Sequence, residues 1–337
     1  MEEDLATFSA ADMTSSPGAE NLWLVDPRGN RYEVLHWSAD HAFEAGLRAW
    51  SPDAGHALFV SNDQVVDVDL RNAAMTAFAV PHVFTASYGP QGSGATIVAL
   101  SDDPATNPNG HGGVLQSFGP HGVSAALLAS DVNTVASSPT RWLYSRDGAV
   151  VYLSDAGGLR TVTFAGGQAR GFDTIEDSGV TCSPVRWWDA HTILVSCDEP
   201  AGSRLWLAPD DGGAATALSA PAGQDVEIAP DWGSFDAVQT ARGQIFVQRP
   251  AACGSVDIAT LNAAGRAHHL AIPGSLGTDW LIGAAGDRIA IRSDTSENCY
   301  PHGWFGFYNP LTHTTQKVIS DPPNQFGAGA AVAFDPA

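Results

Sequence analysis

NLWLVDPRGNRYEVL, residues 21–35, recurs in altered form as SRLWLAPDDGGAATALS at 203–219. Each copy has an apolar run, a turn rich in Gly, Pro, Asn or Asp, and a second run, which is typical of a β-hairpin. Weaker copies occur at 64–80, 112–129, 158–173, 255–272 and 303–319. One apolar position aligns across the seven copies with intervals of 43 to 52 residues: Trp23, Val66, Leu115, Val162, Trp206, Ile258 and Phe307. This interval is typical of a four-stranded propeller blade.

A second kind of hairpin lies between these copies. It begins near an aromatic residue, turns, and returns through a β-branched run, as in RWLYSRDGAVVYLS at 141–154. Each blade is therefore expected to have an inner hairpin followed by an outer one. The pattern predicts blades at about 40–81, 82–130, 138–174, 180–220, 226–273 and 276–320.

The two ends of the chain are expected to form one more blade. The copy at 21–35 has only a short strand at 5–9 before it, and GAGAAVAF at 327–334 has the character of an unpaired inner strand. Pairing 324–337 with 5–36 would remove the open sheet edges of a linear array. We predict an all-β chain, a seven-bladed β-propeller in one domain over 1–337. Six blades with a decorated end is the alternative.

Charge excludes some partners. The chain has 37 acidic and 16 basic residues and a formal net charge of −21, so it would repel nucleic acid and anionic membranes. No apolar run reaches the roughly 18 residues of a membrane span. The opening Met-Glu-Glu-Asp is no signal peptide, so either the protein is cytosolic or it is an exported protein whose targeting segment has been removed. We expect a monomer.

Two turns carry a family resemblance. Trp-Ser-Pro-Asp at 50–53, Ser-Arg-Asp-Gly at 145–148 and the longer stretch 144–167 resemble the repeat of TolB-like and related WD-type propellers. The resemblance implies a propeller, often periplasmic or associated with the cell envelope, and often a platform for a partner. It implies no single activity, because the fold supports many functions.

The positions of the four cysteines agree with this assignment of hairpins to blades. Cys182 and Cys197 flank the two strands of one predicted inner hairpin, and Cys253 and Cys299 fall in equivalent loops of consecutive blades. No pair has the C-x-x-C spacing of zinc ribbons or thioredoxin-like sites. We predict the disulfides Cys182–Cys197 and Cys253–Cys299, and hence a secreted or envelope protein. Buried free thiols are the alternative.

Charged residues beside tryptophans are expected to open the first strand of several blades and to converge at the mouth of the channel. Such a site would bind a carboxylate or a sugar, with indoles as apolar walls. Alternatively, the charges pair with one another or with loop backbone and the indoles pack between blades. The candidate ligand-binding residues are Arg48, Trp50, Arg141, Arg186, Asp231, Asp279, His111 and His302.

Long loops at 101–113, 248–255 and 292–303 are expected on the same face, since long loops commonly serve recognition. Asp102, Asp103, Asn107 and Asn109 offer oxygen ligands for calcium. Their order departs from the EF-hand pattern, so a plain turn rich in Asp and Asn is the alternative, and we predict no required cofactor.

Two functions remain open. The first is a non-catalytic binding or scaffold propeller of the bacterial cell envelope, which uses its loop-rich face for a protein or glycan partner. The second is a hydrolase or lyase acting at the channel mouth with Arg and Asp residues. Unpaired Arg and Asp side chains around a wet pocket would favour the enzyme, and exposed aromatic residues would favour the scaffold.

Overall fold

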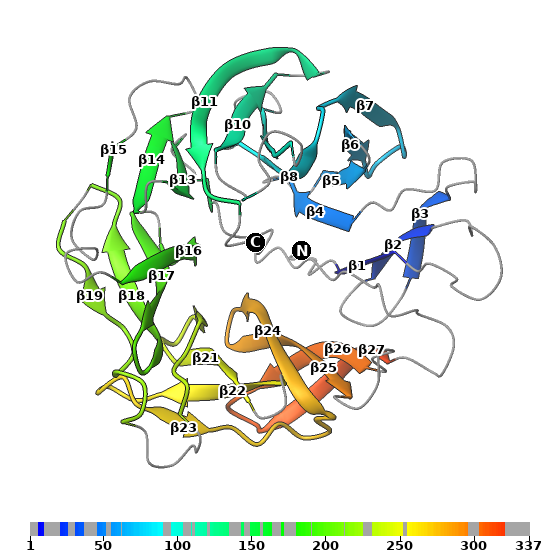
Figure 1. Ribbon diagram of the computed structural model, residues 1–337. Helices are drawn as coiled ribbons and strands as arrows, with labels where there is room; N and C mark the ends of the chain where they lie inside the picture. The colour runs from blue at the N-terminus through cyan, green and yellow to red at the C-terminus, as the bar shows by residue number, and fades with distance from the viewer. Residues whose placement is uncertain are drawn as a thin grey trace. The chain divides into compact units, whose positions relative to one another are not determined.

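The computed structural model describes twenty segments of the chain (Figure 1). They are residues 6–9, 21–25, 31–36, 46–51, 55–61, 63–89, 96–103, 109, 112–119, 122–134, 143–144, 149–155, 158–163, 170–171, 180–189, 191–211, 213–224, 231–251, 255–295 and 303–320. In these segments the regular structure is β-strand throughout, which confirms the all-β prediction. No helix long and apolar enough to cross a membrane occurs in them.

The described strands form one three-stranded sheet and six four-stranded sheets, each built from consecutive antiparallel strands. The three-stranded sheet contains β1 (Ala6–Ser9), β2 (Asn21–Val25) and β3 (Arg31–His36). The next three sheets contain β4 (Gly46–Trp50), β5 (His56–Ser61), β6 (Gln64–Asp69) and β7 (Met75–Ala79); β8 (Val83–Tyr88), β9 (Ile97–Ser101), β10 (Gly113–Phe118) and β11 (Ser124–Val132); and β12 (Leu143–Tyr144), β13 (Ala149–Leu153), β14 (Leu159–Thr163) and β15 (Arg170–Gly171). The last three contain β16 (Thr181–Trp187), β17 (Thr192–Glu199), β18 (Gly202–Pro209) and β19 (Thr216–Ala217); β20 (Asp236–Gln239), β21 (Ile245–Pro250), β22 (Val256–Leu261) and β23 (Ala267–His269); and β24 (Gly277–Ala285), β25 (Arg288–Thr295), β26 (Gly303–Asn309) and β27 (Thr314–Ser320).

The predicted repeat is confirmed strand by strand. The seven aligned apolar positions lie in β2, β6, β10, β14, β18, β22 and β26, so each four-stranded sheet carries its anchor in its third strand. The short strand predicted before the first copy is β1, which pairs with β2. The strand predicted at 327–334 lies outside the described residues, so the seven-blade closure stays a prediction.

Burial falls from the middle strands to the last strand of a sheet. Val150, Val151 and Tyr152 of β13 are all buried, which means that both faces of this second strand are covered. In β7, a fourth strand, exposed residues alternate with half-buried ones. The apolar runs of the second and third strands therefore supply the core, while the last strand meets solvent on one face.

The chain divides into two compact units. Unit 1 contains Met1–Ala42, Glu199–Leu205 and Ala217–Ala337; unit 2 contains Phe43–Asp198 and Trp206–Thr216. Neighbouring sheets pack face to face within each unit. Leu58 and Tyr88 belong to a cluster shared by the β4–β7 and β8–β11 sheets of unit 2, and Phe246 and Ile289 belong to a cluster shared by the β20–β23 and β24–β27 sheets of unit 1.

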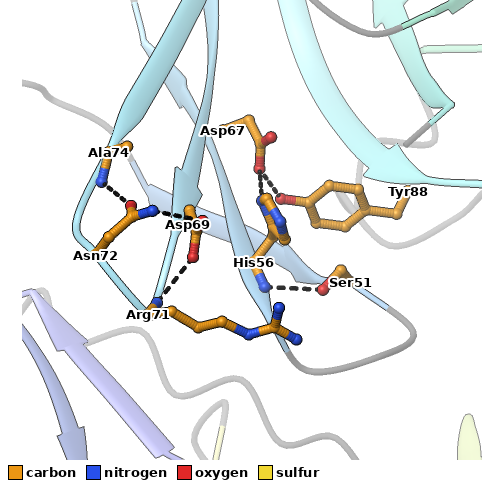
Figure 2. A network of polar contacts seen from close by, with 8 residues as sticks. All are labelled: Ser51, His56, Asp67, Asp69, Arg71, Asn72, Ala74 and Tyr88. Atoms are coloured by element: carbon orange, nitrogen blue, oxygen red, sulfur yellow. Dashed lines mark hydrogen bonds and ion pairs between the residues drawn. The ribbon is translucent and has the colours of Figure 1, made fainter. Parts of the chain in front are cut away.

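Asp and Asn side chains fix the turns between strands. After β6, Asp69 accepts a hydrogen bond from the backbone N–H of Arg71 (2.8 Å) and another from the Asn72 amide (2.9 Å). Asn72 in turn accepts one from the backbone N–H of Ala74 (2.8 Å), as Figure 2 shows. These contacts close the turn within its own residues, the usual role of Asp and Asn at such positions.

The predicted Cys182–Cys197 disulfide is confirmed. The two residues lie directly opposite each other in β16 and β17, and both side chains are buried. They lie inside the strands, whereas the sequence placed them just outside. Cys253 and Cys299 fall outside the described residues, and their pairing stays a prediction.

Candidate functional site

The structure describes only part of the predicted channel mouth. Arg141, His111, His302 and Asn107 lie outside the described residues. Arg48 and Trp50 are described by their backbone alone, in β4. Arg48 and Arg186 belong to unit 2, while Asp231 and Asp279 belong to unit 1. The convergence of all these residues at one mouth therefore stays a prediction. Asp231 and Asp279 are the candidates of unit 1 whose side chains the structure describes.

The positions of three candidates within their strands differ from the prediction. Arg186 was expected to open the first strand of its blade, but β16 begins at Thr181 and Arg186 is its penultimate residue. Arg48 is the third residue and Trp50 the last of the five residues of β4. The prediction that they open the strand is wrong, since each strand begins before them. The β16–β17 register shifts between Pro184 and Arg186, and such a bulge accommodates proline.

Asp231 is held by a buried arginine. A 2.7 Å ion pair joins Arg249 Nη2 to Asp231 Oδ1, with side chains 1% and 9% exposed. Arg249 Nε also donates to the carbonyl of Gly233 (3.4 Å), and Asp231 Oδ1 accepts from the Gly233 N–H (3.1 Å). Asp231 is thus paired with a buried arginine and with loop backbone, while its assignment to a ligand site stays a prediction.

Gly233 allows this segment to approach β18. Its φ is +86°, and an added Cβ would overlap the carbonyl of Ser203. The Ser203 N–H donates to the Trp232 carbonyl (3.0 Å), and the Ser234 N–H donates to the Ser203 carbonyl (2.9 Å). Residues 231–234 are therefore fixed on one side by β18 and on the other by Arg249, and only glycine fits at 233.

The neighbouring residue Gln248 fixes the strand that carries Asp279. Its Nε2 donates to the Asp279 carbonyl (2.8 Å), and its Oε1 accepts from the Leu281 N–H (2.5 Å). Gln248 is buried in β21 and joins the β20–β23 sheet to the β24–β27 sheet. The Asp279 side chain accepts a hydrogen bond from the Ser275 hydroxyl (2.7 Å).

These contacts bracket two exposed indoles. Trp232 lies between Asp231 and Gly233, which Arg249 binds, and Trp280 lies between Asp279 and Leu281, which Gln248 binds. Each tryptophan is 40% exposed, as is Leu276. We call Trp232, Leu276 and Trp280 the tryptophan platform. The hydrogen bonds hold the chain on either side of each tryptophan, and exposed large apolar side chains are typical of binding surfaces.

Two carboxyl groups of unit 1 have raised pKa values. Burial raises the pKa of Asp257, opposed by the charges of Arg249 and His269 and reinforced by Asp279. Burial also raises the pKa of Asp294, opposed by its ion pair with Arg292 (2.9 Å) and reinforced by Asp279. Asp257 Oδ1 and Asp279 Oδ1 have no hydrogen-bond partner in the described part of the chain. Arg249 and His269 therefore offset part of the charge of Asp257, and Arg292 offsets part of the charge of Asp294.

The raised pKa of Asp257 predicts a pH dependence of stability. Between the unfolded value of about 3.9 and the raised folded value, the folded state binds more protons, so its stability falls as pH rises through that window. Asp257→Asn should raise the melting temperature at pH 7, and the gain should shrink as pH falls toward 4. Differential scanning calorimetry across pH 4–8 measures this. A variant less stable than wild type at pH 7 would contradict it.

The residues proposed for calcium are engaged with protein groups where they are described. Asp102 accepts a hydrogen bond from the Thr134 hydroxyl (2.6 Å), and Asp103 lies 3.8 Å from His82 Nε2. Asn109 is exposed. Among the residues that the structure describes, no three His, Cys, Asp or Glu side chains are placed to hold a metal ion. The calcium site stays an untested prediction.

Unit 2 has a polar network of its own (Figure 2). Asp67 Oδ1 accepts a hydrogen bond from the Tyr88 hydroxyl (2.5 Å) and lies 3.1 Å from His56 Nδ1. Ser51 Oγ accepts from the backbone N–H of His56 (2.9 Å). The network ties β5 and β6 to β8 of the next sheet, which gives it a role in joining adjacent sheets.

Sequence reasoning missed Gln248 and Arg249, which it placed at a loop start. Both belong to β21, whose sequence is IFVQRP. Two polar residues in the second strand of a blade, where both faces are buried, are a signal that could have identified them, because buried polar groups need partners.

Comparisons with known proteins address the fold. No protein-family model matches the chain, and no curated protein matches its sequence. Among solved structures, TolB from Acinetobacter baumannii matches with a TM-score of 0.53 and 13% identity over 98% of this chain and 66% of that one. An oligogalacturonate lyase in complex with manganese matches with a TM-score of 0.58 and 12% identity over 87% of this chain and 84% of that one. A puromycin hydrolase matches with a TM-score of 0.58 and 14% identity over 100% of this chain and 55% of that one.

This chain therefore spans just under two thirds of the TolB chain and about half of the puromycin hydrolase chain. Identities this low show a shared fold and leave activity open. Small antiparallel sheets built from consecutive strands, a blade-length repeat and these matches agree with one another. The chain has the fold of a TolB-like β-propeller.

Proposed function

We propose that the chain is a binding propeller that recognises a partner, a protein or a glycan, through the tryptophan platform. The observation that carries this proposal is the pair of 40% exposed indoles, each bracketed by hydrogen bonds from a buried residue of β21. A tryptophan side chain has only two rotatable bonds and loses little conformational entropy when it binds, so more of its contact energy contributes to affinity.

The buried disulfide supports an extracytoplasmic location for this activity. Cys182 and Cys197 are joined across β16 and β17, and structural disulfides persist mainly in oxidising compartments. The resemblance to TolB-like repeats points to the cell envelope, and we propose a secreted or envelope protein that acts as a monomer.

We further propose that the sheet of β1, β2 and β3 is completed by residues 327–334 to close a ring of seven blades. Six described sheets have four strands, while this one has three. A fourth strand would cover the open edge beside β1, which otherwise stays available for unwanted pairing.

Affinity capture tests the binding function. Wild-type protein, a Trp232→Ala/Trp280→Ala variant and a Leu127→Ala control are each immobilised and exposed to a cell-envelope extract of the source organism. Leu127 is a suitable control because it is exposed and lies in unit 2. Quantitative mass spectrometry should show a partner retained by wild type and control and reduced at least tenfold on the double variant. Equal retention on all three would contradict the proposal.

A hydrolase or lyase activity is the second candidate. It is favoured by the raised pKa of Asp257 and Asp294, since buried carboxyls with raised pKa values can act as general acids. Asp257→Asn should then abolish turnover of an oligogalacturonate or of puromycin without affecting partner capture. Absence of turnover by the wild-type protein on both substrates would leave binding as the function.

A further inference from the structure

We propose that the outer edge of β7 (Met75–Ala79) pairs with an extended, neutral or basic segment of a partner protein. β7 is the last strand of its sheet, and among the described strands it pairs with β6 alone (Figure 1). A strand at a sheet edge presents N–H and C=O groups that an added strand can satisfy. β7 belongs to unit 2 and the tryptophan platform to unit 1, so this inference does not rest on the proposed function.

The last strands of the other sheets carry features that protect a sheet edge. β15, β19 and β23 have only two or three residues, and β3 and β27 contain charged residues. β11 is long, but its pairing with β10 has three register shifts. Short strands, charges and bulges are the means by which natural sheets avoid pairing with other chains.

β7 has none of these features. Its sequence, MTAFA, contains no charged residue and no proline, and its five residues pair with β6 without a register shift. Its side chains alternate between exposed and half-buried. The half-buried Phe78 packs against Phe118 of the next sheet, with ring centroids 5.4 Å apart. The strand is therefore held through one face, while its edge is regular and uncharged.

Hydrogen bonds at the two ends of β7 show which backbone groups point outward. The Val80 N–H donates to the Asp63 carbonyl (2.9 Å), and the Asp69 N–H donates to the Ala74 carbonyl (2.9 Å). In an antiparallel pair, hydrogen-bonded positions alternate with positions that are not bonded to the neighbouring strand. The register between these two bonds has no shift, so the even-numbered residues of β7 bond to β6. The N–H and C=O groups of the odd-numbered residues therefore point away from β6.

Charge determines the kind of partner. β7 is uncharged in a chain whose formal net charge is −21, so an acidic segment would be repelled. A second copy of the chain carries the same charge and would be repelled as well. The outward N–H and C=O groups of Ala77 and Ala79 match the spacing of an extended backbone, which pairs through alternate residues. The edge therefore fits an extended segment of another protein that carries no acidic residue.

Hydrogen–deuterium exchange of the free protein tests whether the edge is open. We expect the amides of Ala77 and Ala79 to exchange rapidly, and those of Thr76 and Phe78, which bond to β6, to exchange slowly. Equally slow exchange at all four positions would overturn the proposal, because another part of the chain would then cover the edge. Protection that increases with protein concentration would also overturn it, because a second copy would then be the occupant.

A defined peptide tests the pairing itself. The probe is the capped, fluorescently labelled heptapeptide Lys-Thr-Val-Thr-Val-Thr-Lys. Its control carries N-methyl groups on two consecutive central residues, so that neither edge of the control peptide can pair. We expect fluorescence polarisation to show at least tenfold weaker binding of the control, and bound probe to slow exchange at Ala77 and Ala79. Since both peptides have the same charge, equal affinity would overturn the proposal, as would no measurable binding of the probe.

A proline substitution at the edge identifies the site. The Ala77 N–H points away from β6, so Ala77→Pro removes the outward donor and keeps the hydrogen bonds between β6 and β7. This variant should bind the probe at least tenfold more weakly, with a melting temperature that confirms folding. Trp232→Ala/Trp280→Ala should bind the probe like wild type, so the two binding proposals can fail separately. Wild-type affinity of a folded Ala77→Pro variant, or loss of probe binding by the tryptophan variant, would overturn the assignment to β7.

Discussion

Replacing Arg249 with methionine is expected to lower the free energy of unfolding by about 3–5 kcal/mol, because it leaves the Asp231 carboxylate buried without its partner. Arg249 is the largest of the fully buried side chains described, and its 2.7 Å ion pair is almost completely shielded from solvent. Methionine keeps much of the side-chain volume of arginine, so the loss of stability measures the effect of removing the positive charge. Urea denaturation followed by circular dichroism gives the value.

Two further variants identify the cause. Asp231→Asn combined with Arg249→Met removes both charges and should restore a large part of the lost stability, since no unpaired ion remains. Arg242 forms a 2.6 Å ion pair with Asp287, and the arginine side chain of this pair is 64% exposed. Arg242→Met breaks the pair and should lower the free energy of unfolding by only about 0–1 kcal/mol. If Arg249→Met were as stable as Arg242→Met, the buried ion pair would contribute no more to the free energy of unfolding than the exposed pair does.

Removing the Cys182–Cys197 disulfide is expected to cost about 3 kcal/mol, the loop-closure value for a sequence separation of 15 residues. The unfolded chain gains conformational freedom when the cross-link is lost, and the folded chain also loses buried volume if both residues become alanine. Urea denaturation of the Cys182→Ala/Cys197→Ala variant measures the sum. Denaturation of wild-type protein under reducing conditions, which retains both sulfur atoms, isolates the cross-link.

Burial also predicts how this disulfide responds to reductant. Both cysteines are at most 1% exposed, so a thiolate reaches them only after local opening. Dithiothreitol should leave the bond intact in native protein and reduce it rapidly in 6 M urea, as mass spectrometry of alkylated peptides would show. Rapid reduction in the native protein would contradict the buried position. The same peptide map tests the predicted Cys253–Cys299 bond.

Much of the fold was predictable because the repeat is local. The apolar anchors recur at blade-length intervals, and all seven lie in the expected hairpin of their sheets. The partner of Cys182 was predictable for the same reason, since a hairpin sets residues opposite each other at short separation. Strand limits were harder to predict: Pro184 is compatible with β16 only because the register shifts beside it.

The site was less predictable because its contacts are long-range in sequence. Asp231 and Asp279 were identified as candidates, but their supports lie 18 residues away at Arg249 and 31 residues away at Gln248. Neither distance follows from a hairpin register. They depend on how a strand packs against the sheets on either side, which the residue pattern of one blade does not encode.

The claim that Trp232 and Trp280 form a single binding surface can be tested most directly by one double-mutant cycle. Dissociation constants of the captured partner are measured for wild type, Trp232→Ala, Trp280→Ala and the double variant. We predict that each single substitution weakens binding at least tenfold, with non-additive losses that show coupling between the two positions. Dissociation constants within twofold of wild type for all three variants would contradict a binding role for the tryptophan platform.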